Sequence, residues 1–586
     1  MAGESSDADA VSRSTSRAML ATRDPEMTPM TEPADLAFLN GAVYTVDAAR
    51  RWARAVAVRE GRIVAVGTDD RIRELVGPGT DVIDLRDRML LPGFQDAHVH
   101  PPSAGMEMLR CNLSDAFALQ EYERLVATYA AEHPDAGWIL GGGWSMSLFP
   151  GGNPPKDVLD RLVPDRPVYL TSRDGHTAWV NSKALEIADV TDQTLDPRDG
   201  VIIRDRDGWP AGALHEGAMT LVEKWVPEDT REDWVEGLRV AQAHLHRLGI
   251  TAWNDAIVGG SYPTLDAYLA FAGAGELTAR VIGSLWWDRH RGDEQIDGLL
   301  TARERGRAGR FAASAVKIMQ DGVVENFTAA TLSPYLDEDG HPTGNAGKSY
   351  VEPEALKGYV TRLDAEGFQV HFHALGDRAV RESLDAIEAA LAANGPSDRR
   401  HHLAHLQVVH PEDIPRFRAL GAVANAQPLW AVNEPQMLEL TIPFLGPERS
   451  GWQYPFASLV RAGAMLAMGS DWSVSSANPL EEIHVAVNRT AFPDALYAPE
   501  ERSVTDPFIP HERLDLPTAI ATFTMGSAYV NHLDDVTGSI EVGKHADLAV
   551  LDRNLFAHPL DEIHAARVEL TLVEGDRVFT AEGFEG

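Results

Sequence analysis

The chain has 586 residues, more than one hydrophobic core normally holds, so its length predicts a large catalytic domain with one or two smaller satellites. Its 88 acidic and 52 basic residues give a formal net charge of -36, which argues against nonspecific nucleic-acid binding and against attachment to anionic membranes, because both need a basic surface. Cys111 is the single cysteine, which excludes an intrachain disulfide and a multi-cysteine metal site and fits a reducing cytoplasm.

The N-terminal stretch, residues 1–33, is rich in Ser, Ala, Asp, Glu, Thr and Met. It lacks the basic start and apolar core of a secretory signal, and we interpret it as a disordered tail. The sequence contains no run of 18 apolar residues that would predict a transmembrane helix. We therefore expect a cytoplasmic protein with no membrane partner.

Both ends of the remaining chain show short β-like runs. In residues 34–92, the segment Val58–Ile63 is typical of a hairpin, with two alternating runs joined through a turn that contains Gly61. Residues 538–586 repeat this style. Because such short strands need a second layer, we predict one small β-sandwich built from both ends, with the main domain, residues 93–537, inserted between its halves.

The first part of the main domain, residues of about 102–220, mixes helix-like and loop-like segments, and we predict an inserted α/β subdomain there. Two tracts in it, 141–144 and 172–181, are dense in glycine, aromatic and polar residues. They fit either the turns of a satellite fold or a cap that lines a substrate pocket.

Amphipathic helices then alternate with short apolar strands, which indicates βα units. Together with the stretch 91–100, eight strands are predicted, at 91–100, 250–255, 279–285, 315–322, 369–374, 401–407, 422–428 and 465–472. Eight such units are the number in a closed (β/α)8 TIM-type barrel of the α/β class, whose chemistry lies at the C-terminal ends of the strands.

Polar residues gather at those strand ends. Alternate side chains of a strand share a face, so His98 and His100 would point to one side, about 7 Å apart along the strand, which suits one metal ion. An isolated pair of this kind is more often a buried pair or an accident of composition. Here it belongs to an ordered set of residue types that bind Zn²⁺ and similar ions in hydrolytic sites: His98, His100, Lys317, His373, His405 and Asp471.

With these motifs the chain resembles the amidohydrolase superfamily and, within it, amidohydrolase family 3, a group of metal-dependent hydrolases. The matching segments are Leu91-Pro92-Gly93-Phe94 with the two histidines, Gly141-Gly142-Gly143-Trp144, Asp174-Gly175-His176, Gly212 to Glu216, Lys317 with Asp321-Gly322, His373 to Ala379, Gly469-Ser470-Asp471-Trp472 and the closing stretch Gly538 to Asp547. The resemblance covers nearly all of the chain after the tail.

The resemblance implies that the six residues hold one or two divalent ions, Zn²⁺ or another metal, and that Asp471 is also the general base. His405 is chosen over His401 and His402 because His-x-Gln matches the family pattern. It further implies catalytic roles for Lys317 and His176. Four residues are expected to contact the substrate: Trp144, Glu216, Asp321 and Trp472.

Lys317 would not be an ordinary ammonium beside such an ion. Repulsion at about 4 Å in an effective dielectric of about 20 is roughly 8 kcal/mol, whereas deprotonating a lysine at pH 7 costs about 4.6 kcal/mol. The neutral amine could react with carbon dioxide to give a carbamate that bridges two ions, as the resemblance suggests. The alternative is an unmodified lysine turned away from a single ion.

The predicted function is hydrolysis of an amide or related C–N bond of a small molecule by metal-activated water. Two alternatives stay open: a metal-dependent lyase or isomerase on the same barrel, and a catalytically silent binding module. A homodimer is a further expectation. We expect His371 to face the core or a helix, away from the pocket, and the remaining histidines considered to be surface or helix residues: His244, His246, His484 and His558.

Overall fold

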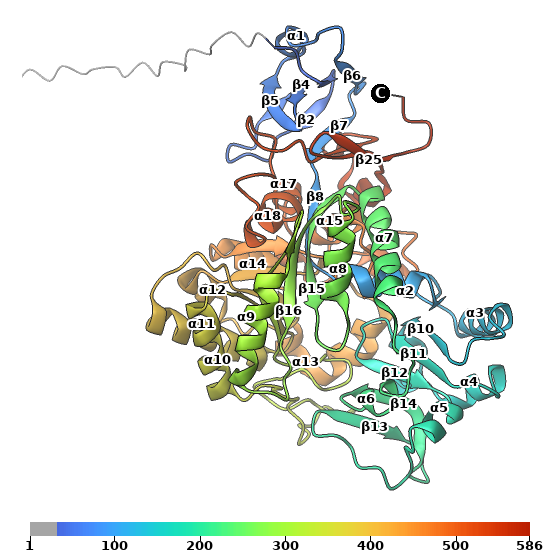
Figure 1. Ribbon diagram of the computed structural model, residues 1–586. Helices are drawn as coiled ribbons and strands as arrows, with labels where there is room; N and C mark the ends of the chain where they lie inside the picture. Colours follow the sequence, from blue (N-terminus) through green and yellow to red (C-terminus); the bar gives the residue numbers. More distant parts are fainter. Residues whose placement is uncertain (1–31, 586) are drawn as a thin grey trace, which may run out of the picture.

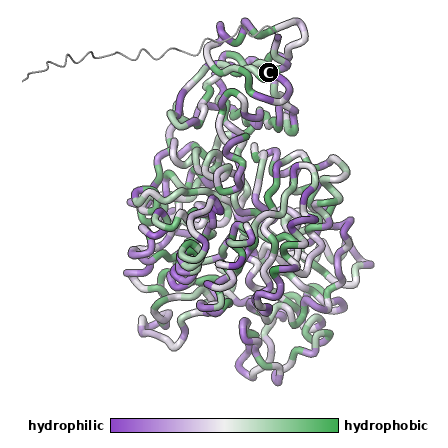
Figure 2. Tube along the Cα trace, turned by 60° about the vertical axis from the view of Figure 1, so that its left-hand side comes forward, coloured by the Kyte–Doolittle hydropathy of each residue, from purple (hydrophilic) through white to green (hydrophobic). Residues whose placement is uncertain are grey.

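The computed structural model describes residues 32–585. The predicted disordered tail, residues 1–33, lies almost wholly outside this range. The described chain forms a barrel with a sandwich lobe at one end and an inserted subdomain at the other, and the sandwich stands apart in both views (Figures 1 and 2). No helix within residues 32–585 is both long and apolar enough to cross a membrane.

Eight parallel strands form the barrel, as predicted. Their order along the sheet is β8 (Phe94–Val99), β15 (Ile250–Val258), β16 (Arg280–Trp286), β18 (Phe311–Met319), β19 (Gln369–Ala374), β20 (His402–His405), β21 (Val423–Ala426) and β22 (Met465–Met468). Their outward faces are almost continuously apolar and buried, because helices cover them. The predicted α/β fold with a nearly closed TIM-type barrel is confirmed.

The barrel closes where the chain leaves β22 and meets β8. Asp471 N donates to His98 O at 2.7 Å, and His100 N donates to Trp472 O at 3.0 Å. A Cβ on Gly469 would lie only 2.4 Å from His98 N, so glycine is required for this close approach. The closure therefore brings Asp471 next to the two histidines of β8.

The helices that cover the barrel follow its strands in sequence. They are α7 (Arg231–Arg247) before β15, α8 (Thr264–Gly273), α9 (Ile296–Arg305), α10 (Pro353–Ala365), α11 (Asp377–Asn394), α12 (Ile414–Leu420), α14 (Phe456–Arg461), α15 (Pro479–Asn488), α17 (Leu516–Ala521) and α18 (Ser527–Val530). The helix α2 (Pro101–Met108) begins with two prolines directly after His100, because proline is tolerated in the first helical turn.

The sandwich combines strands from both ends of the chain, which confirms that part of the prediction. One sheet has the order β5 (Arg62–Gly67), β4 (Ala55–Arg59), β1 (Leu36–Leu39) and β6 (Asp81–Asp84), and the other β25 (Asp576–Thr580), β24 (Val568–Val573), β23 (Leu548–Leu551), β7 (Met89–Pro92), β2 (Ala42–Tyr44) and β3 (Trp52–Ala53). β7 pairs antiparallel with β23, and the apolar side chains of both sheets form one core. The predicted hairpin joins β4 to β5 through Glu60 (φ 50°) and Gly61 (φ 71°). The predicted domain boundaries stay a prediction.

The insertion is a mixed sheet with helices packed on it. Its strands are β9 (Cys111–Asn112), β10 (Ile139–Trp144), β11 (Val168–Ser172), β12 (Thr177–Val180), β13 (Gly200–Arg204) and β14 (Pro210–Glu216), and its helices include α3 (Leu119–Glu132), α4 (Lys156–Leu162) and α5 (Ser182–Ile187). It lies at the end of the barrel away from the sandwich (Figure 1). The β11–β12 turn and the end of β14 carry His176 and Glu216 to the barrel mouth.

Candidate functional site

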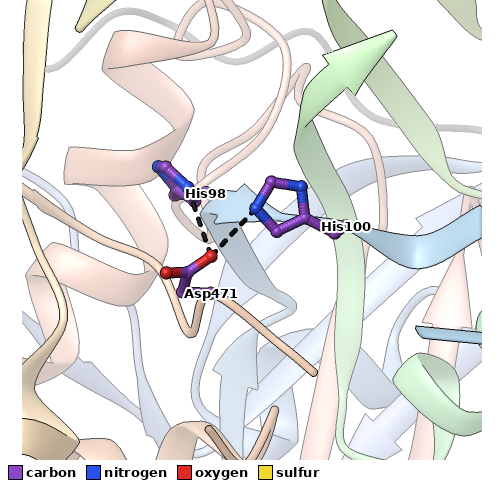
Figure 3. Close-up of side chains that lie close together, drawn as sticks. All are labelled: His98, His100 and Asp471. Carbon is purple, nitrogen blue, oxygen red and sulfur yellow. Dashed lines mark ion pairs between the residues drawn. The ribbon is translucent and has the colours of Figure 1, made fainter. Parts of the chain in front are cut away.

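Three of the predicted ligands converge at the C-terminal end of the barrel. His98 is the second-to-last residue of β8, His100 directly follows that strand, and Asp471 lies in the turn after β22. Asp471 Oδ1 lies 2.9 Å from His100 Nε2 and 3.3 Å from His98 Nε2, and one potential ligand atom of each residue lies within 4.8 Å of the others. Both imidazoles face this carboxylate oxygen (Figure 3). The three residues form a candidate site for a metal ion.

Three further predicted ligands surround this group. Lys317 Nζ on β18 lies 3.3 Å from His98 Nε2, and His405 Nδ1 on β20 lies 3.7 Å from Asp471 Oδ2. The ring centroids of His373 and His405 are 4.4 Å apart. The structure therefore gathers all six residues around the barrel mouth, while their individual roles as ligands stay predictions.

The unsatisfied polar atoms of the site fit a cation. Both ring nitrogens of His405 and Oδ1 of Asp471 are buried without a hydrogen-bond partner in the described chain. Buried polar atoms are rarely left in this state, and imidazole nitrogens and a carboxylate oxygen match the donor set of Zn²⁺. The residues present therefore fit a divalent metal.

The charges of these groups agree with that fit. Burial lowers the pKa of His98 to about 3 and lowers the pKa of His373 and His405 well below the ordinary value, so all three imidazoles keep free lone pairs. Burial alone would raise the pKa of Asp471, but His98 and His100 outweigh it and hold that pKa well below its ordinary value. Burial lowers the pKa of Lys317 to about 7.

The insertion contributes a second charged pair. His176 Nδ1 lies 2.8 Å from Glu216 Oε1, and the ring centroids of His176 and His373 are 5.4 Å apart. Burial would lower the pKa of His176, but Glu216 outweighs it and raises that pKa to about 9. Burial would likewise raise the pKa of Glu216, which His176 instead lowers to about 2. His176 therefore carries a positive charge at neutral pH.

A cavity of about 390 Å³ lies between the barrel mouth and the insertion. His176, Trp144 and Trp472 line it, together with His373, His405 and Asp471. Much of its remaining wall is apolar or aromatic: Phe117, Met146, Leu429, Trp430, Met437, Phe492 and Leu496. The lining therefore combines apolar and aromatic side chains with the polar groups of the site.

Two residues predicted to contact substrate are not among those that line the cavity. Glu216 lies behind His176. Asp321 lies behind His373, with Oδ1 3.3 Å from its Nδ1, and accepts three backbone N–H groups, from Ala330, Leu375 and Gly376. Burial raises the pKa of Asp321 to about 7 despite these bonds. In this structure both carboxyl groups contact histidines of the site.

Backbone strain marks the ends of the strands that carry the site. Glu216 (φ 51°), His405 (φ 80°) and Asp471 (φ 55°) all adopt the left-handed region. Non-glycine residues rarely adopt it, and they do so where the surrounding structure holds them, often at active sites. These turns place His405 and Asp471 at the cavity and Glu216 against His176.

The three histidines predicted for the sixth strand occupy different positions relative to the cavity. His405 lines the cavity, whereas His401 Nε2 lies 3.1 Å from Asp364 on the outer side of the barrel. His402 lies inside the barrel, where its ring packs on His371 with centroids 3.9 Å apart. The structure thus brings only His405 of the three to the other predicted ligands.

His371 faces the core, as one of the two expected alternatives, and it is not among the residues that line the cavity. Its Nε2 nevertheless lies 2.8 Å from His98 Nδ1, inside the barrel directly below the site. The physical reason is the strand period of two, which places His371 on the same face as His373.

Other residues of the site carried no clear signal in the sequence. His244, on α7 as expected, also lines the cavity and stacks on Trp472 with ring centroids 4.7 Å apart. Glu325 lines the cavity and accepts hydrogen bonds from Gln407 (3.0 Å) and Thr441 (2.9 Å). These contacts join segments far apart in the chain, which no local pattern reveals.

The fold and the site define a TIM-type barrel with a histidine and carboxylate cluster of metal-binding type at its mouth. A sequence profile described as "Amidohydrolase family" matches residues 81–579. The chain belongs to the amidohydrolase family.

Comparisons with individual proteins agree. The chain is 32% identical over 557 residues to Protein LONG AFTER FAR-RED 3 of Arabidopsis thaliana, covering 93% of this chain and 92% of that protein. It is 26% identical over 560 residues to N-substituted formamide deformylase of Arthrobacter pascens, covering 93% and 98%. An uncharacterized metal-dependent hydrolase from Pyrococcus furiosus has a similar crystal structure, with a TM-score of 0.65, 26% identity, and coverage of 89% of this chain and 99% of that chain.

Proposed function

We propose that this protein hydrolyses an amide or related C–N bond of a small molecule, with Zn²⁺ or another divalent metal as cofactor. The observation that carries the proposal is the convergence of His98, His100 and Asp471 at the mouth of the barrel, where ligand atoms of the surrounding cluster lack hydrogen-bond partners. The similarity of this chain to an N-substituted formamide deformylase supports a C–N bond as the bond that is hydrolysed.

One or two ions are proposed. His98, His100 and Asp471 would hold one ion, and His373 and His405 a second, with Lys317 between them. When bound, such ions lower the pKa of a coordinated water and polarise a carbonyl oxygen.

The environment of Lys317 supports the proposal that it is carboxylated. Burial lowers its pKa to about 7, so much of the amine is uncharged at neutral pH. The amine nitrogen would attack carbon dioxide and lose one proton, which gives a carbamate anion. Carboxylation thus replaces the buried ammonium form of Lys317 with a carbamate anion next to the site, and the negative charge favours metal binding.

Asp471 is proposed as the general base and then the general acid. Its Oδ1 faces His98 and His100, while its Oδ2 lies toward His405, so the two oxygens can serve different partners. The carboxylate would take a proton from the attacking water and deliver it to the departing nitrogen. This delivery matters for an amide because nitrogen is a poor leaving group unless it is protonated.

His176 is proposed to stabilise negative charge on the carbonyl oxygen. Glu216 keeps it protonated, and it lines the cavity close to His373. A fixed N–H donor aimed at developing charge is worth most in a site that excludes water. Trp144 and Trp472 would bound the substrate pocket, whereas the contacts of Glu216 and Asp321 favour roles in orienting His176 and His373.

A screen of N-formyl, N-acyl and cyclic amides against the purified, metal-analysed protein tests the proposal. On a substrate found this way, Asp471→Asn should reduce turnover about 10²–10⁴-fold through lost proton transfer, and further if metal is also lost. Metal content measured on the same preparations separates the two causes. Wild-type turnover by Asp471→Asn, or by protein shown to be metal-free, would refute the mechanism.

A further inference from the structure

We infer that His371 is a positioning residue, which, with Ser284 and Asn254, fixes the tautomer of His98 so that its Nε2 faces the metal site with a free lone pair. The inference rests on the metal site of the proposed function and concerns residues beneath it. These three residues form a hydrogen-bonded chain that runs from His98 into the barrel.

The chain has three links of ordinary hydrogen-bond length. His98 Nδ1 lies 2.8 Å from His371 Nε2, His371 Nδ1 lies 3.1 Å from Ser284 Oγ, and Ser284 Oγ lies 2.8 Å from Asn254 Oδ1. His371, Ser284 and Asn254 are fully buried, and His98 is 1% exposed. With water excluded, each donor in the chain must use the acceptor beside it.

The far end of the chain sets its direction. Asn254 Nδ2 donates to Asn531 Oδ1 at 3.3 Å, so the carbonyl oxygen of the Asn254 side chain faces Ser284. A carbonyl oxygen only accepts, so the Ser284 hydroxyl donates to it. The hydroxyl oxygen then accepts from His371 Nδ1–H. A neutral imidazole carries one N–H, which leaves His371 Nε2 as the acceptor for His98 Nδ1–H.

The near end of the chain puts His98 Nε2 among the predicted ligands. It lies 3.3 Å from Lys317 Nζ and 3.3 Å from Asp471 Oδ1. With the proton of His98 on Nδ1, the lone pair of Nε2 faces these two residues, where the proposed ion would bind.

A metal ligand needs that lone pair, because a protonated nitrogen cannot coordinate an ion. The chain would therefore hold His98 ready to bind, and it would also fix the ring orientation. Groups that hydrogen-bond to the outer nitrogen of a ligating histidine typically contribute 10–100-fold to metal affinity or activity, by order of magnitude.

The same barrel layer provides a matched control. His402 is as deeply buried as His371 and packs on its ring, but its Nδ1 lies 3.1 Å from Asn425 Nδ2, and no hydrogen bond joins it to His98 within the described chain. If these buried imidazoles serve only to fill the barrel, replacing either one should have the same effect.

The test is the affinity of the full-length protein for Zn²⁺, measured by competition with a coloured chelator. His371→Gln places an amide oxygen near the position of Nε2, where it can still accept from His98. His371→Asn is one methylene shorter and can reach Ser284 but not His98. We expect His371→Asn to weaken Zn²⁺ binding about 10–100-fold, and His371→Gln and His402→Gln to stay within about threefold of wild type.

Circular dichroism and thermal melting establish that each variant is folded. If His371→Asn does not fold, the Ser284→Ala protein tests the inference instead, because this change removes the acceptor that keeps the proton of His371 on Nδ1. We expect Ser284→Ala to bind Zn²⁺ about tenfold more weakly than wild type. Wild-type affinity in the folded His371→Asn or Ser284→Ala protein would overturn the inference while leaving the proposed function intact.

Two other results separate the proposals. A wild-type protein that binds Zn²⁺ but hydrolyses no amide would overturn the proposed function alone, because the affinities of the variants would still report on His98. A wild-type protein that binds neither Zn²⁺ nor any other divalent metal would overturn both.

Discussion

Replacing Glu216 by glutamine keeps the shape of the side chain but removes the charge that holds a proton on His176. The glutamine Oε1 can still accept from Thr328 Oγ1, which lies 3.1 Å from Glu216 Oε1 in the structure, so the local packing should survive. What changes is the pKa of His176, which Glu216 raises against the effect of burial. In the variant that contribution is lost, while burial still lowers the pKa of His176 and Asp174 and Asp471 still raise it, so the pKa falls toward the ordinary value.

The size of the effect follows from the two pKa values. At pH 8 an imidazole with a pKa of about 9, as in His176, is about 90% protonated, whereas one with the ordinary value of about 6.5 is only about 3% protonated. If protonated His176 stabilises the carbonyl oxygen, kcat/KM at pH 8 should fall about 30-fold. The loss should shrink as the pH falls below about 6.5, where both proteins carry the proton.

The assay is the pH profile of kcat/KM for both proteins on the same amide, at matched metal content. The alkaline limb of the variant should lie at lower pH than that of the wild type. A bound cation lowers the pKa of His176 in both proteins, so the predicted quantity is the difference in pH between the two limbs. His176→Gln should remove the limb, and adding Glu216→Gln to it should change little, because the two residues act as a unit. An alkaline limb that does not move in Glu216→Gln would refute this role of the pair.

Three further predictions concern the metal, acid stability and the two-part sandwich. Lys317→Ala should lower the metal content of purified protein, and wild-type protein equilibrated with isotopically labelled bicarbonate should show a carbamate carbon resonance; unchanged metal content and no resonance would count against carboxylation. Burial would raise the pKa of Glu574, but hydrogen bonds from Arg310 and Arg280 lower it to about 2. The Glu574 carboxylate therefore stabilises the folded protein above pH 4.5, and this stabilisation is lost as the pH falls toward 2. Glu574→Gln should therefore lower the free energy of unfolding by about 1–3 kcal/mol at pH 7, seen in urea titrations, and a difference from wild type that persists at pH 2 would contradict this. Deleting residues 538–586 should expose the apolar edge of β7 and cause aggregation, whereas a soluble, cooperatively folding truncated chain would contradict that account.

The sequence by itself determined the barrel and most of the candidate ligands. The eight strands are short apolar runs whose signal is local, and the period of two along a strand places His98 with His100. The resemblance to amidohydrolase family 3 then singled out Lys317, His405 and Asp471 from many similar residues.

Only the tertiary structure decided how distant segments meet. The sequence left the insertion open between a satellite fold and a cap, and the structure shows that its His176 lines the cavity, with Glu216 behind it. It also shows that Ser284 and Asn254 continue the hydrogen bonds of His371 beneath the site. Local periodicity fixes which face of its own strand a side chain occupies, but its partners across the barrel depend on strand register and closure, which are set by packing over the whole chain.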